Sequence, residues 1–299
     1  MKKILITGSN GLLGQTLTNL LLKEPDTYEV IGLSRGENRS GRYDFEYHSI
    51  DITNQQSLSD CLLKTQPDFI VHTAAMTNVD SCEENRKECD LLNVTAVQYL
   101  VDLSKKIHAH LIHISTDFIF DGKQGYYKET DTPNPLSYYG LSKLKSEKVV
   151  NNSAIDYTIL RTILVYGKVN NLGRNNIVLW IKQMLEEKRE ITIIDDQFRM
   201  PTYAEDLAYA CKLSIDLRAQ GTFNISSNTL LSIYDMAHQI AQTFELNPKY
   251  IKAVDTKTLN QKAQRPPKTG FDLTKTNREL GFFPKSFSQD LQRFKARLS

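Results

Sequence analysis

The 299-residue sequence has no long hydrophobic run and no large excess of charge of either sign. Its first apolar stretch, Ile4–Ile6, is interrupted by Gly8. It is therefore too short for a signal-peptide core or a membrane span, and we interpret it as a buried strand. The formal net charge of +2 gives no reason to expect nucleic acid or an anionic membrane as a partner. There are also no internal repeats or low-complexity tracts.

The cysteines do not form a metal-binding pattern. There are four of them, and none belongs to a CxxC motif or to a Cys/His cluster with zinc-ligand spacing. Cys82 and Cys89 are seven residues apart on a predicted helix, where we expect two solvent-tolerant thiols rather than a metal site. We therefore predict no metal, and a reduced, cytoplasmic protein.

The first half of the chain alternates short apolar runs with amphipathic stretches, which predicts a parallel sheet with helices on both faces. Right-handed crossovers then favour an α/β fold with a doubly wound, Rossmann sheet. The predicted strands are Ile4–Thr7, Glu29–Leu33, Phe69–His72, Leu111–Ile114 and Thr158–Leu160. The predicted helices are Leu12–Leu22, Gln55–Lys64, Asn93–Lys106 and one that begins at Tyr139.

The pattern loosens after about residue 165. Residues 170–176 read as a polar loop, 177–187 as a helix, 191–194 as a strand and 234–244 as an amphipathic helix. Residues 261–270 contain Pro266, Pro267 and Gly270 and are predicted to be a loop. We expect a nucleotide-binding domain over residues 1–165 and a smaller, substrate-binding C-terminal α/β lobe over 166–299. Elements could be exchanged between them, and a ligand would lie between the lobes.

Gly8, Gly11 and Gly14 follow the first predicted strand and open the first predicted helix. Without Cβ atoms the turn can be tight, and the backbone can approach a phosphate closely. The N–H groups at the helix start, around Leu12 and Leu13, could then receive a dinucleotide pyrophosphate. The alternative is an ordinary glycine-rich turn, but the strand–turn–helix context favours nucleotide binding.

The second strand ends at Ser34 and Arg35, where an NAD-binding protein usually has an acidic residue for the ribose hydroxyls. A hydroxyl and a guanidinium suit a 2′-phosphate instead, so we expect NADPH, with NADH as the alternative. Arg35 could equally be a solvated loop residue. Asp51 and Ile52, after the next extended segment, are placed to meet the adenine.

Tyr139 and Lys143 are four residues apart on a predicted helix and therefore share a face. A phenol has an ordinary pKa near 10, and a nearby ammonium favours the phenolate, so that the pair could move a proton at neutral pH. The preceding strand ends at Ser115 and Thr116, which supply hydroxyls at the same edge of the sheet. His113, within that strand, is expected to be a packed core residue rather than a catalyst.

These motifs together resemble the extended short-chain dehydrogenase/reductases, and within them the dTDP-4-dehydrorhamnose reductases. The resemblance covers nearly the whole chain. It rests on the glycine turn and on the segments Ala74–Asp80, Leu92–Val94, Ser115–Gly122, Glu129–Lys143, Leu160–Thr162, Asp196–Thr202 and Arg265–Pro266.

The resemblance implies hydride transfer from NAD(P)H to the C4 carbonyl of a dTDP-linked 4-keto-6-deoxyhexose, giving dTDP-L-rhamnose. Tyr139 would donate the proton, Lys143 would assist it and hold the nicotinamide ribose, and Thr116 would orient the sugar carbonyl. Asp117 would contact the sugar, together with Ser115. The cofactor site would also be lined by Ala74, Ala75, Met76, Thr77 and Asn93. A homodimer is the expectation for such a family.

The sequence departs from the pattern at two places. Leu164 stands where these reductases often have a tryptophan beside the sugar, and the only tryptophan, Trp180, lies elsewhere. Gln15 and Thr16 stand where some members have an acidic site that links subunits through a metal. A related keto-sugar is therefore an alternative substrate. Arg265 is a candidate ligand for the sugar-nucleotide diphosphate, or else an exposed loop charge.

A second interpretation comes from a different class of protein. The regulatory β subunit of methionine adenosyltransferase resembles the same family, and the segments Leu160–Gly167 and Gln264–Pro266 are compatible with it. In that case the fold would bind NADP and a partner protein without turnover. The residues Thr116, Tyr139 and Lys143 are compatible with an enzyme but do not exclude the binding role.

Overall fold

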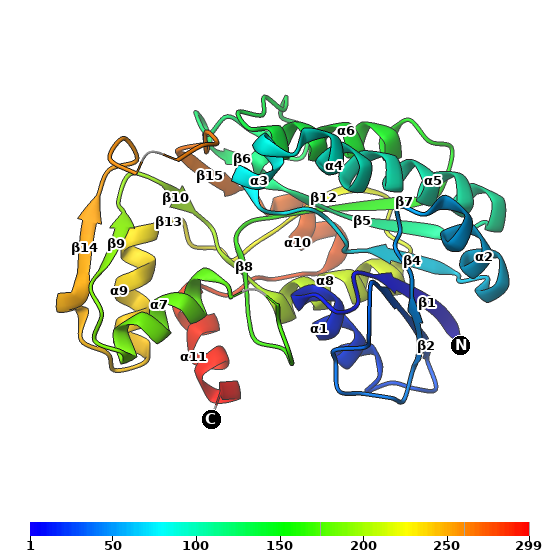
Figure 1. Cartoon of the computed structure of the whole chain (residues 1–299), viewed down its shortest axis with the longest axis horizontal. Coiled ribbons are helices and arrows are strands. Elements are labelled where there is room, and N and C mark those ends of the chain that lie inside the picture. Colours follow the sequence, from blue (N-terminus) through cyan, green and yellow to red (C-terminus); the bar gives the residue numbers. More distant parts are fainter. Residues whose placement is uncertain (174, 260, 299) are drawn as a thin grey trace.

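A seven-stranded parallel sheet forms the centre of the computed structural model, which describes residues 1–173, 175–259 and 261–298 (Figure 1). The strand order is β3–β2–β1–β4–β5–β7–β12, and every neighbouring pair runs parallel. The strands are β1 (Lys2–Thr7), β2 (Tyr28–Ser34), β3 (Glu46–Ser49), β4 (Phe69–His72), β5 (His110–Thr116), β7 (Tyr157–Thr162) and β12 (Gly221–Ile225). The predicted α/β, doubly wound sheet is confirmed.

The winding of the sheet reverses between β1 and β4. From β1 the chain moves outward through β2 to β3, and it then returns to β4 on the other side of β1. Ligands of open α/β sheets bind in the crevice outside the carboxyl ends of the strands at such a reversal. The turn that follows β1 and the segment that follows β4 therefore border the expected ligand position.

Alternate residues of β1 face two different helical layers. Ile4 and Ile6 pack with α1, α8 and α10, whereas Leu5 packs with α2 and α5. The helices are α1 (Leu12–Leu21), α2 (Gln55–Thr65), α3 (Val79–Glu84), α4 (Arg86–Asp90), α5 (Ala96–Ile107), α6 (Tyr138–Asn151), α7 (Ile177–Glu186), α8 (Ala204–Leu217), α9 (Ile233–Thr243), α10 (Thr274–Leu280) and α11 (Phe287–Leu298). This period-two burial explains why β1 reads as a continuous apolar run.

Side-chain caps define where several helices begin. Asn54, Ser137, Asn176 and Ser232 precede α2, α6, α7 and α9, and each accepts a hydrogen bond from a backbone N–H of the first turn. Helix α1 differs, because its N-cap is Gly11 and no side chain caps it. The first N–H groups of α1 are consequently left for another acceptor.

The smaller lobe carries short sheets and the helices α7, α9 and α11, on the left of Figure 1. Its four-stranded sheet has the order β13–β10–β15–β6, and two further pairs are β11–β8 and β14–β9. These strands are β6 (Gly125–Tyr127), β8 (Val165–Tyr166), β9 (Ile191–Ile194), β10 (Phe198–Arg199), β11 (Thr202–Tyr203), β13 (Leu231–Ser232), β14 (Ile251–Val254) and β15 (Lys268–Phe271).

The two lobes exchange elements in both directions. Strand β12 joins the central sheet beside β7, and α8 and α10 cover one face of that sheet, although all three follow residue 165. Conversely, β6 precedes residue 165 and pairs with β15 in the smaller lobe.

Three expectations from the sequence were wrong in detail. Lys268–Phe271 is strand β15 rather than loop, because it pairs on one side with β10 and on the other with β6. Cys82 and Cys89 lie on two short helices, α3 and α4, and both are fully buried rather than solvent-tolerant. The predicted helix over 93–106 begins as a π-helical turn, η1 (Leu91–Thr95), before α5 starts at Ala96. Within the predicted polar loop, Arg174 lies outside the described residues.

Candidate active site

The turn after β1 is shaped for a close approach by a ligand. Gly8 has a φ of +68°, and a Cβ there would lie 2.8 Å from the backbone nitrogen of Ala74. A Cβ on Gly14 would lie 2.3 Å from the carbonyl oxygen of Gly8. The N–H of Gly11 closes the turn by donating to that same carbonyl at 2.8 Å. Together with the uncapped start of α1 at Leu12 and Leu13, this cradle fits a dinucleotide pyrophosphate.

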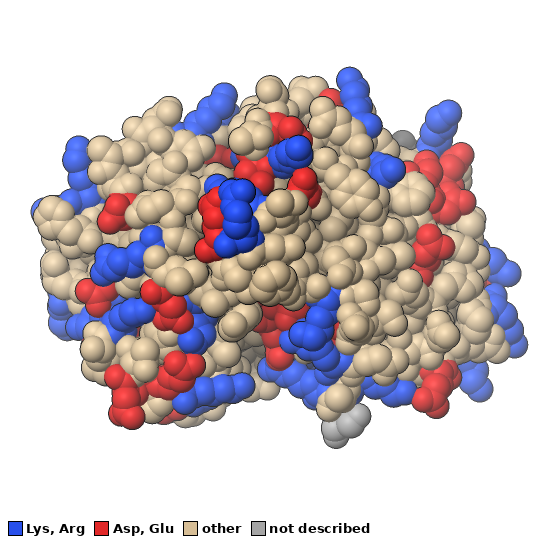
Figure 2. All heavy atoms as spheres, turned by 180° about the vertical axis from the view of Figure 1, so that it is seen from behind, with Lys and Arg blue, Asp and Glu red and all other residues tan. Residues whose placement is uncertain are grey.

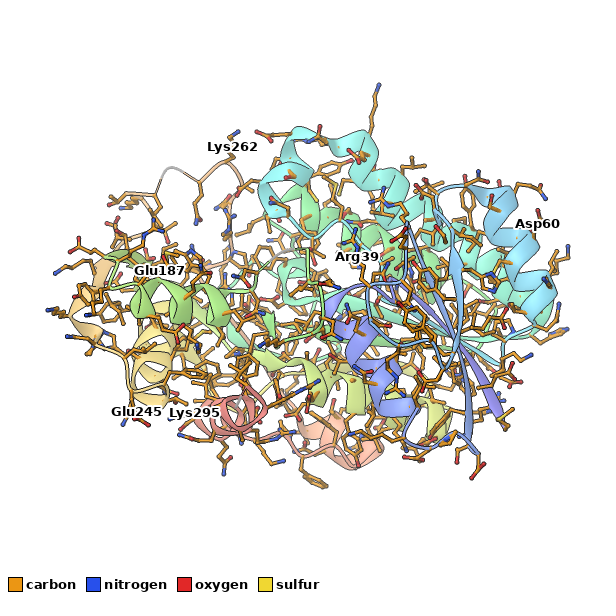
Figure 3. All side chains as sticks on the ribbon, turned by 60° about the horizontal axis from the view of Figure 1, so that its bottom comes forward. Arg39, Asp60, Glu187, Glu245, Lys262 and Lys295 are labelled. Atoms are coloured by element: carbon orange, nitrogen blue, oxygen red, sulfur yellow. The ribbon has the colours of Figure 1, made fainter. Side chains whose placement is uncertain are left out.

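The end of β2 is organised by Asn10. Its backbone N–H donates to Ser34 Oγ at 3.1 Å, and its amide donates to Glu37 O at 2.8 Å and accepts from Arg39 N at 2.8 Å. Ser34 is consequently buried and already engaged. Asn10 and Arg39, which is labelled in Figure 3, were not identified from the sequence. The sequence signal that could have identified them is their position: Asn10 lies two residues after Gly8, and Arg39 lies four residues after Arg35.

Arg35 extends into solvent, with 72% of its side chain exposed. Its Nη1 lies 3.8 Å from Asp51 Oδ2, and Asp51 also accepts hydrogen bonds from the N–H and hydroxyl of Thr53. Desolvation alone would raise the pKa of Asp51, but the hydrogen bonds from Thr53 and the positive charge of Arg35 together outweigh it, so the pKa is lowered. Ile52 is buried. The guanidinium is therefore held loosely and is accessible to a phosphate.

Asn93 anchors the segment that follows β4. Its Oδ1 accepts from the Met76 N–H at 2.8 Å, and its Nδ2 donates to Met76 O and to Ser142 Oγ, both at 3.0 Å. The fixed segment includes Ala74, Ala75, Met76 and Thr77, which lie at the switch between β1 and β4. Asn93 is buried and ties this segment to helix α6. Its placement in a π-helical turn fits a functional site, where such turns often occur.

Three residues at the end of β5 provide polar groups beside α6. Ser115 is buried, and no hydrogen-bond partner of its hydroxyl occurs among the described residues. The Thr116 hydroxyl donates to Asp117 Oδ1 at 3.1 Å and accepts from the Phe118 N–H at 3.2 Å. Asp117 is buried and also accepts from the Thr269 hydroxyl. Thr116 and Ser115 therefore occupy the strand end that the sequence predicted.

Tyr139 and Lys143 lie in the first two turns of α6, which Ser137 caps. The Tyr139 ring packs edge-on against Phe118, with 5.7 Å between ring centroids. Desolvation raises the pKa of Tyr139, a hydrogen bond with Thr116 opposes that rise, and the charge of Asp117 adds to it. The phenol thus starts as the protonated species. The fold thus brings Thr116 and Tyr139 within hydrogen-bond reach of each other.

Lys143 is almost completely buried, with 3% of its surface exposed. Its ammonium donates to His113 Nε2 at 3.2 Å. Desolvation lowers the pKa of Lys143 to about 8, against the opposing charge of Glu147. The neighbouring Glu147 is itself held by Arg161, through hydrogen bonds of 2.7 and 3.0 Å. His113 is buried and hydrogen-bonded, as expected for a core residue.

Arg199 is a buried cation that the sequence analysis missed. Its Nε lies 3.8 Å from Asp117 Oδ2, and its other nitrogens donate to Phe198 O and Pro266 O, both at 2.7 Å. Its guanidinium also lies 5.7 Å from the centre of the Phe118 ring. Desolvation raises the pKa of Asp117, and the charge of Arg199 opposes that rise. The sequence signal that could have identified Arg199 is its position within the segment Asp196–Thr202, which carries the family resemblance.

Leu164 lies two residues beyond Thr162, the β7 partner of Thr116. Its φ of +42° is in the left-handed region, which a leucine rarely adopts. Both Ile163 and Leu164 direct their carbonyls to the N–H of Thr202, at 3.0 and 3.3 Å. The side chain packs between the cores of the smaller lobe. Leu164 is therefore an apolar wall close to the end of β7.

Arg265 is held by Asp80. Its Nη2 lies 2.7 Å from one carboxylate oxygen and its Nη1 3.2 Å from the other. The loop around it is also tied down, since Ala263 N donates to Asp80 and Lys262 pairs with Glu84. Figure 3 shows Lys262 on this loop, close to α3. Arg265 therefore lies beside α3, with its guanidinium already paired.

The family was established by comparison with known proteins. The family described as "RmlD substrate binding domain" matches residues 1–299. The chain belongs to this family. Family membership agrees with the extended short-chain dehydrogenase/reductase pattern of the sequence.

Individual proteins resemble the chain over nine tenths or more of its length. A dTDP-4-dehydrorhamnose reductase of Aggregatibacter actinomycetemcomitans is 30% identical over 99% of both chains. The crystal structure of a dTDP-4-dehydrorhamnose reductase from Bacillus anthracis, in complex with NADP, has a TM-score of 0.88. It is 29% identical and covers 99% of this chain and 100% of its own. The β subunit of bovine (Bos taurus) methionine adenosyltransferase 2 is 30% identical over 92% of this chain and 81% of its own.

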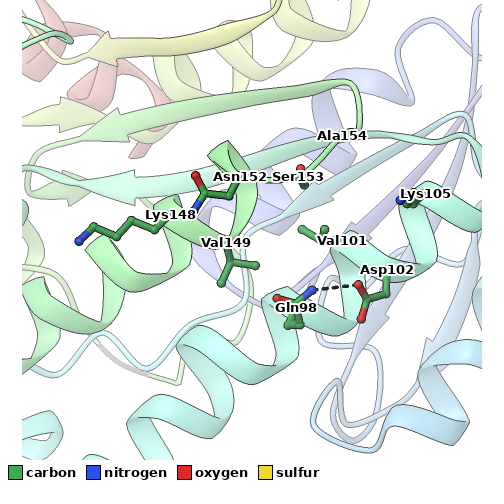
Figure 4. A pocket seen from close by; sticks show the side chains of 9 residues that line it. All are labelled: Gln98, Val101, Asp102, Lys105, Lys148, Val149, Asn152, Ser153 and Ala154. Carbon is green, nitrogen blue, oxygen red and sulfur yellow. Dashed lines mark hydrogen bonds between the residues drawn. The ribbon is translucent and has the colours of Figure 1, made fainter.

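The surface outside the candidate site carries charges of both signs (Figure 2) and a hollow between two helices. Figure 2 shows acidic and basic side chains interspersed over the back of the molecule. A hollow of about 470 Å³ lies between α5 and the end of α6, where Gln98 donates to Asp102 (Figure 4), whereas Tyr139 lies in the first turn of α6. Within residues 1–173, 175–259 and 261–298, no cluster of His, Cys, Asp and Glu could hold a metal. No helix in that part of the chain is long and apolar enough to span a bilayer.

Proposed function

We propose that this protein reduces the 4-keto group of dTDP-4-dehydro-L-rhamnose with NADPH and releases dTDP-L-rhamnose. One observation carries the proposal: Tyr139 and Lys143 lie on α6 beside Thr116, at the carboxyl edge of the sheet. This is the edge that the glycine cradle after β1 also borders. The full-length similarity to dTDP-4-dehydrorhamnose reductases supports the reaction class.

Bound NADPH would supply the hydride. The chain's own residues then have to hold the carbonyl and deliver one proton to its oxygen. The Thr116 hydroxyl would hold that oxygen, and the Tyr139 hydroxyl would donate the proton. Burial raises the pKa of Tyr139, so a nearby cation is needed to make the proton available. The Lys143 ammonium would provide that charge and would also bind the nicotinamide ribose.

The cofactor would lie along the reversal of the sheet. Gly8, Gly11 and Gly14, with the N–H groups of Leu12 and Leu13, would receive the pyrophosphate. Arg35 would bind the 2′-phosphate beside Ser34, while Asp51 and Ile52 would meet the adenine. The segment Ala74–Thr77, fixed by Asn93, would line the middle of the cofactor. The NADP-bound relative supports NADPH over NADH.

The sugar nucleotide would lie between the lobes. Ser115 and Asp117 would contact the sugar, Leu164 would form an apolar wall, and Arg265 would bind the diphosphate by exchanging one of its bonds to Asp80. Residues 1–165 would mainly bind the cofactor and residues 166–299 the substrate. We also propose a cytoplasmic location and a homodimer, without a nucleic-acid, membrane or metal partner.

A second candidate function is regulation of a partner enzyme. It is favoured by the β subunit of methionine adenosyltransferase 2, which is as identical to this chain as the reductase from A. actinomycetemcomitans. In that role the protein would bind NADP and a synthetase without turnover. The catalytic set Thr116, Tyr139 and Lys143 would then only bind the cofactor.

One pair of experiments separates the two candidates. The absorbance of NADPH at 340 nm is followed after addition of dTDP-4-dehydro-L-rhamnose, and of UDP- and GDP-linked keto-sugars as comparisons. The protein is also mixed with purified methionine adenosyltransferase and analysed by size-exclusion chromatography. The reductase proposal expects oxidation of NADPH with the dTDP-linked sugar. No oxidation with any sugar, together with a stable complex, would support the regulator.

A further inference from the structure

The Lys143 ammonium has one hydrogen-bond partner among the described residues, and that partner is a histidine. The ammonium lies 3.2 Å from His113 Nε2, and both residues are buried. His113 is on β5, three residues before Thr116, so it belongs to the strand that carries the proposed carbonyl-holding hydroxyl. An ammonium buried without an acceptor is strongly unfavourable, so this hydrogen bond stabilises the charged form in addition to the nearby charge of Glu147.

The imidazole is kept neutral by its surroundings. Its ring stacks on that of His72, with centroids 5.4 Å apart and planes at 16°. Burial lowers the pKa of His113 well below its ordinary value, and the charge of Lys143 lowers it further. His72 is also kept neutral, since burial lowers its pKa to about 3. A neutral imidazole has one nitrogen with a proton and one with a lone pair.

Two groups compete for His113 Nε2. A hydrogen bond from Lys143 Nζ requires a lone pair on Nε2. Ser146 Oγ, 3.0 Å away, could instead accept a hydrogen bond from a protonated Nε2. Ser146 already donates its own proton to Lys143 O at 2.7 Å. A hydrogen bond from an ammonium is roughly twice as strong as one between neutral groups, so the lysine prevails. The proton must then reside on Nδ1, which has no partner among the described residues.

We propose that His113 is a positioning residue for the reduction, one that holds the Lys143 ammonium in place by accepting a hydrogen bond from it at Nε2. The remaining two N–H groups of Lys143 are thereby directed away from β5. The role goes beyond packing, because it requires one particular tautomer of His113. It also rests on the proposed function, since the lysine it positions is the one that assists Tyr139.

The tautomer can be measured without any substrate. In protein labelled with ¹⁵N-histidine at pH 7, the His113 signals should show a proton on Nδ1 and a lone pair on Nε2. In Lys143→Met the ammonium that needs the Nε2 lone pair is gone. The imidazole proton should then move from Nδ1 to Nε2, where it can form a hydrogen bond to Ser146 Oγ. Lys145→Met is the matched control, because Lys145 pairs with Asp90 and should leave His113 unchanged. A wild-type protein with the proton on Nε2, unaltered by Lys143→Met, would overturn the proposal.

The second test uses the pH dependence of kcat/KM for reduction. The charged and titratable groups around Lys143 and His113 are His72, Cys82, Cys89, Asp117, Tyr139, Glu147 and Arg161. The rate should fall as pH rises through the pKa of Lys143, near 8, because the neutral amine cannot assist Tyr139. His113→Leu removes the acceptor of the charged form, so this fall should begin about one to two pH units lower.

Two variants control this second test. His113→Gln keeps an acceptor for Lys143 and a donor for Ser146, so it should restore the profile. His110→Leu alters another buried histidine of β5, one bonded to Thr158, and should leave the profile unchanged. An unshifted profile in His113→Leu would overturn the proposal. If His113→Leu does not fold, the tautomer measurement decides, and it also stands if no sugar is reduced.

Discussion

Asp80 holds Arg265 through two charge-assisted hydrogen bonds, of 2.7 and 3.2 Å, across 185 residues of sequence. The pair joins the start of α3 to the loop before β15. A sugar diphosphate that bound Arg265 would compete with Asp80 for the same guanidinium. Removing Arg265 and removing Asp80 should therefore have different effects if Arg265 binds the ligand, and the same effect if Arg265 only holds the loop in place.

Arg265→Ala should raise the KM for the nucleotide sugar by about tenfold or more, since a hydrogen bond to a charged group is commonly worth 1.5–3 kcal/mol. The dissociation constant of NADPH should not change. Asp80→Asn should leave KM unchanged or lower it, because the guanidinium is released. Lys262→Ala, on the same loop, is the control. Equal rises in KM for Asp80→Asn and Arg265→Ala would mean that Arg265 only docks the loop.

Tyr139→Phe should reduce kcat by about 10²–10⁴-fold, the usual contribution of a general acid. The ring remains to pack against Phe118, so the melting temperature and the affinity for NADPH should be retained. Tyr138→Phe is a matched control, because the Tyr138 hydroxyl donates to Asp90 of α4 rather than to a residue of the proposed site. Full activity of Tyr139→Phe with the true substrate would remove Tyr139 from the mechanism.

Arg35→Asp should weaken NADPH binding far more than NADH binding, because it replaces attraction to the 2′-phosphate with repulsion. Titration of both cofactors by fluorescence measures the two dissociation constants. Arg189→Asp makes the same charge change at an exposed site on the smaller lobe and should alter neither. If wild-type protein bound NADH as tightly as NADPH, the predicted preference would be wrong.

Gly14→Ala should lower the free energy of unfolding by about 1–3 kcal/mol, as expected for overpacking. The new Cβ would meet the backbone of Gly8 at 2.3 Å, so the turn must shift and NADPH affinity should fall as well. Gly281→Ala is the control, because its φ of +64° is unfavourable for alanine but no atom lies within 4 Å. It should reduce stability without affecting NADPH. An unchanged NADPH affinity in Gly14→Ala would contradict the proposal that the glycine turn binds the pyrophosphate.

Acid should destabilise the protein partly through His110. Burial lowers its pKa to about 4 in the folded protein, whereas the unfolded chain binds a proton below about pH 6.5. His110 therefore does not reduce the free energy of unfolding above pH 6.5, and it reduces this free energy progressively as the pH falls toward 4. Each unit of pKa is worth about 1.4 kcal/mol, so the loss at pH 4 is roughly 3 kcal/mol. Urea unfolding of His110→Gln between pH 7 and 4 should show a flatter dependence than that of the wild type.

Regular patterns made most of the central sheet predictable, but strands β3 and β12 were not among the predicted strands, and long-range pairing hid parts of the smaller lobe. The apolar runs of β1, β4 and β5 could be read because strands buried on both faces are continuously hydrophobic. Lys268–Phe271 carries no such run, and only its pairing with β6 and β10 makes it a strand. Short strands of two residues, such as β10, leave no periodicity to detect.

The candidate site divides in the same way. Glycine spacing and the interval between Tyr139 and Lys143 depend on local geometry, so the sequence alone located them. Arg199 was missed because its significance comes from Asp117, a residue 82 positions earlier that it meets only in the folded chain. The burial of Cys82 and Cys89 was misjudged because it depends on how α3 and α4 pack, which helical periodicity does not report.

The exchange of β6 and β12 has a consequence for how the molecule comes apart. A fragment ending at residue 165 would lack the edge strand β12, and Ile4 and Ile6 would lose their cover of α8 and α10. The remaining fragment would lack β6 beside β15. Neither half completes its own sheet, so the two should melt in a single cooperative transition rather than one after the other. The crevice between the lobes thus persists for as long as the protein is folded at all.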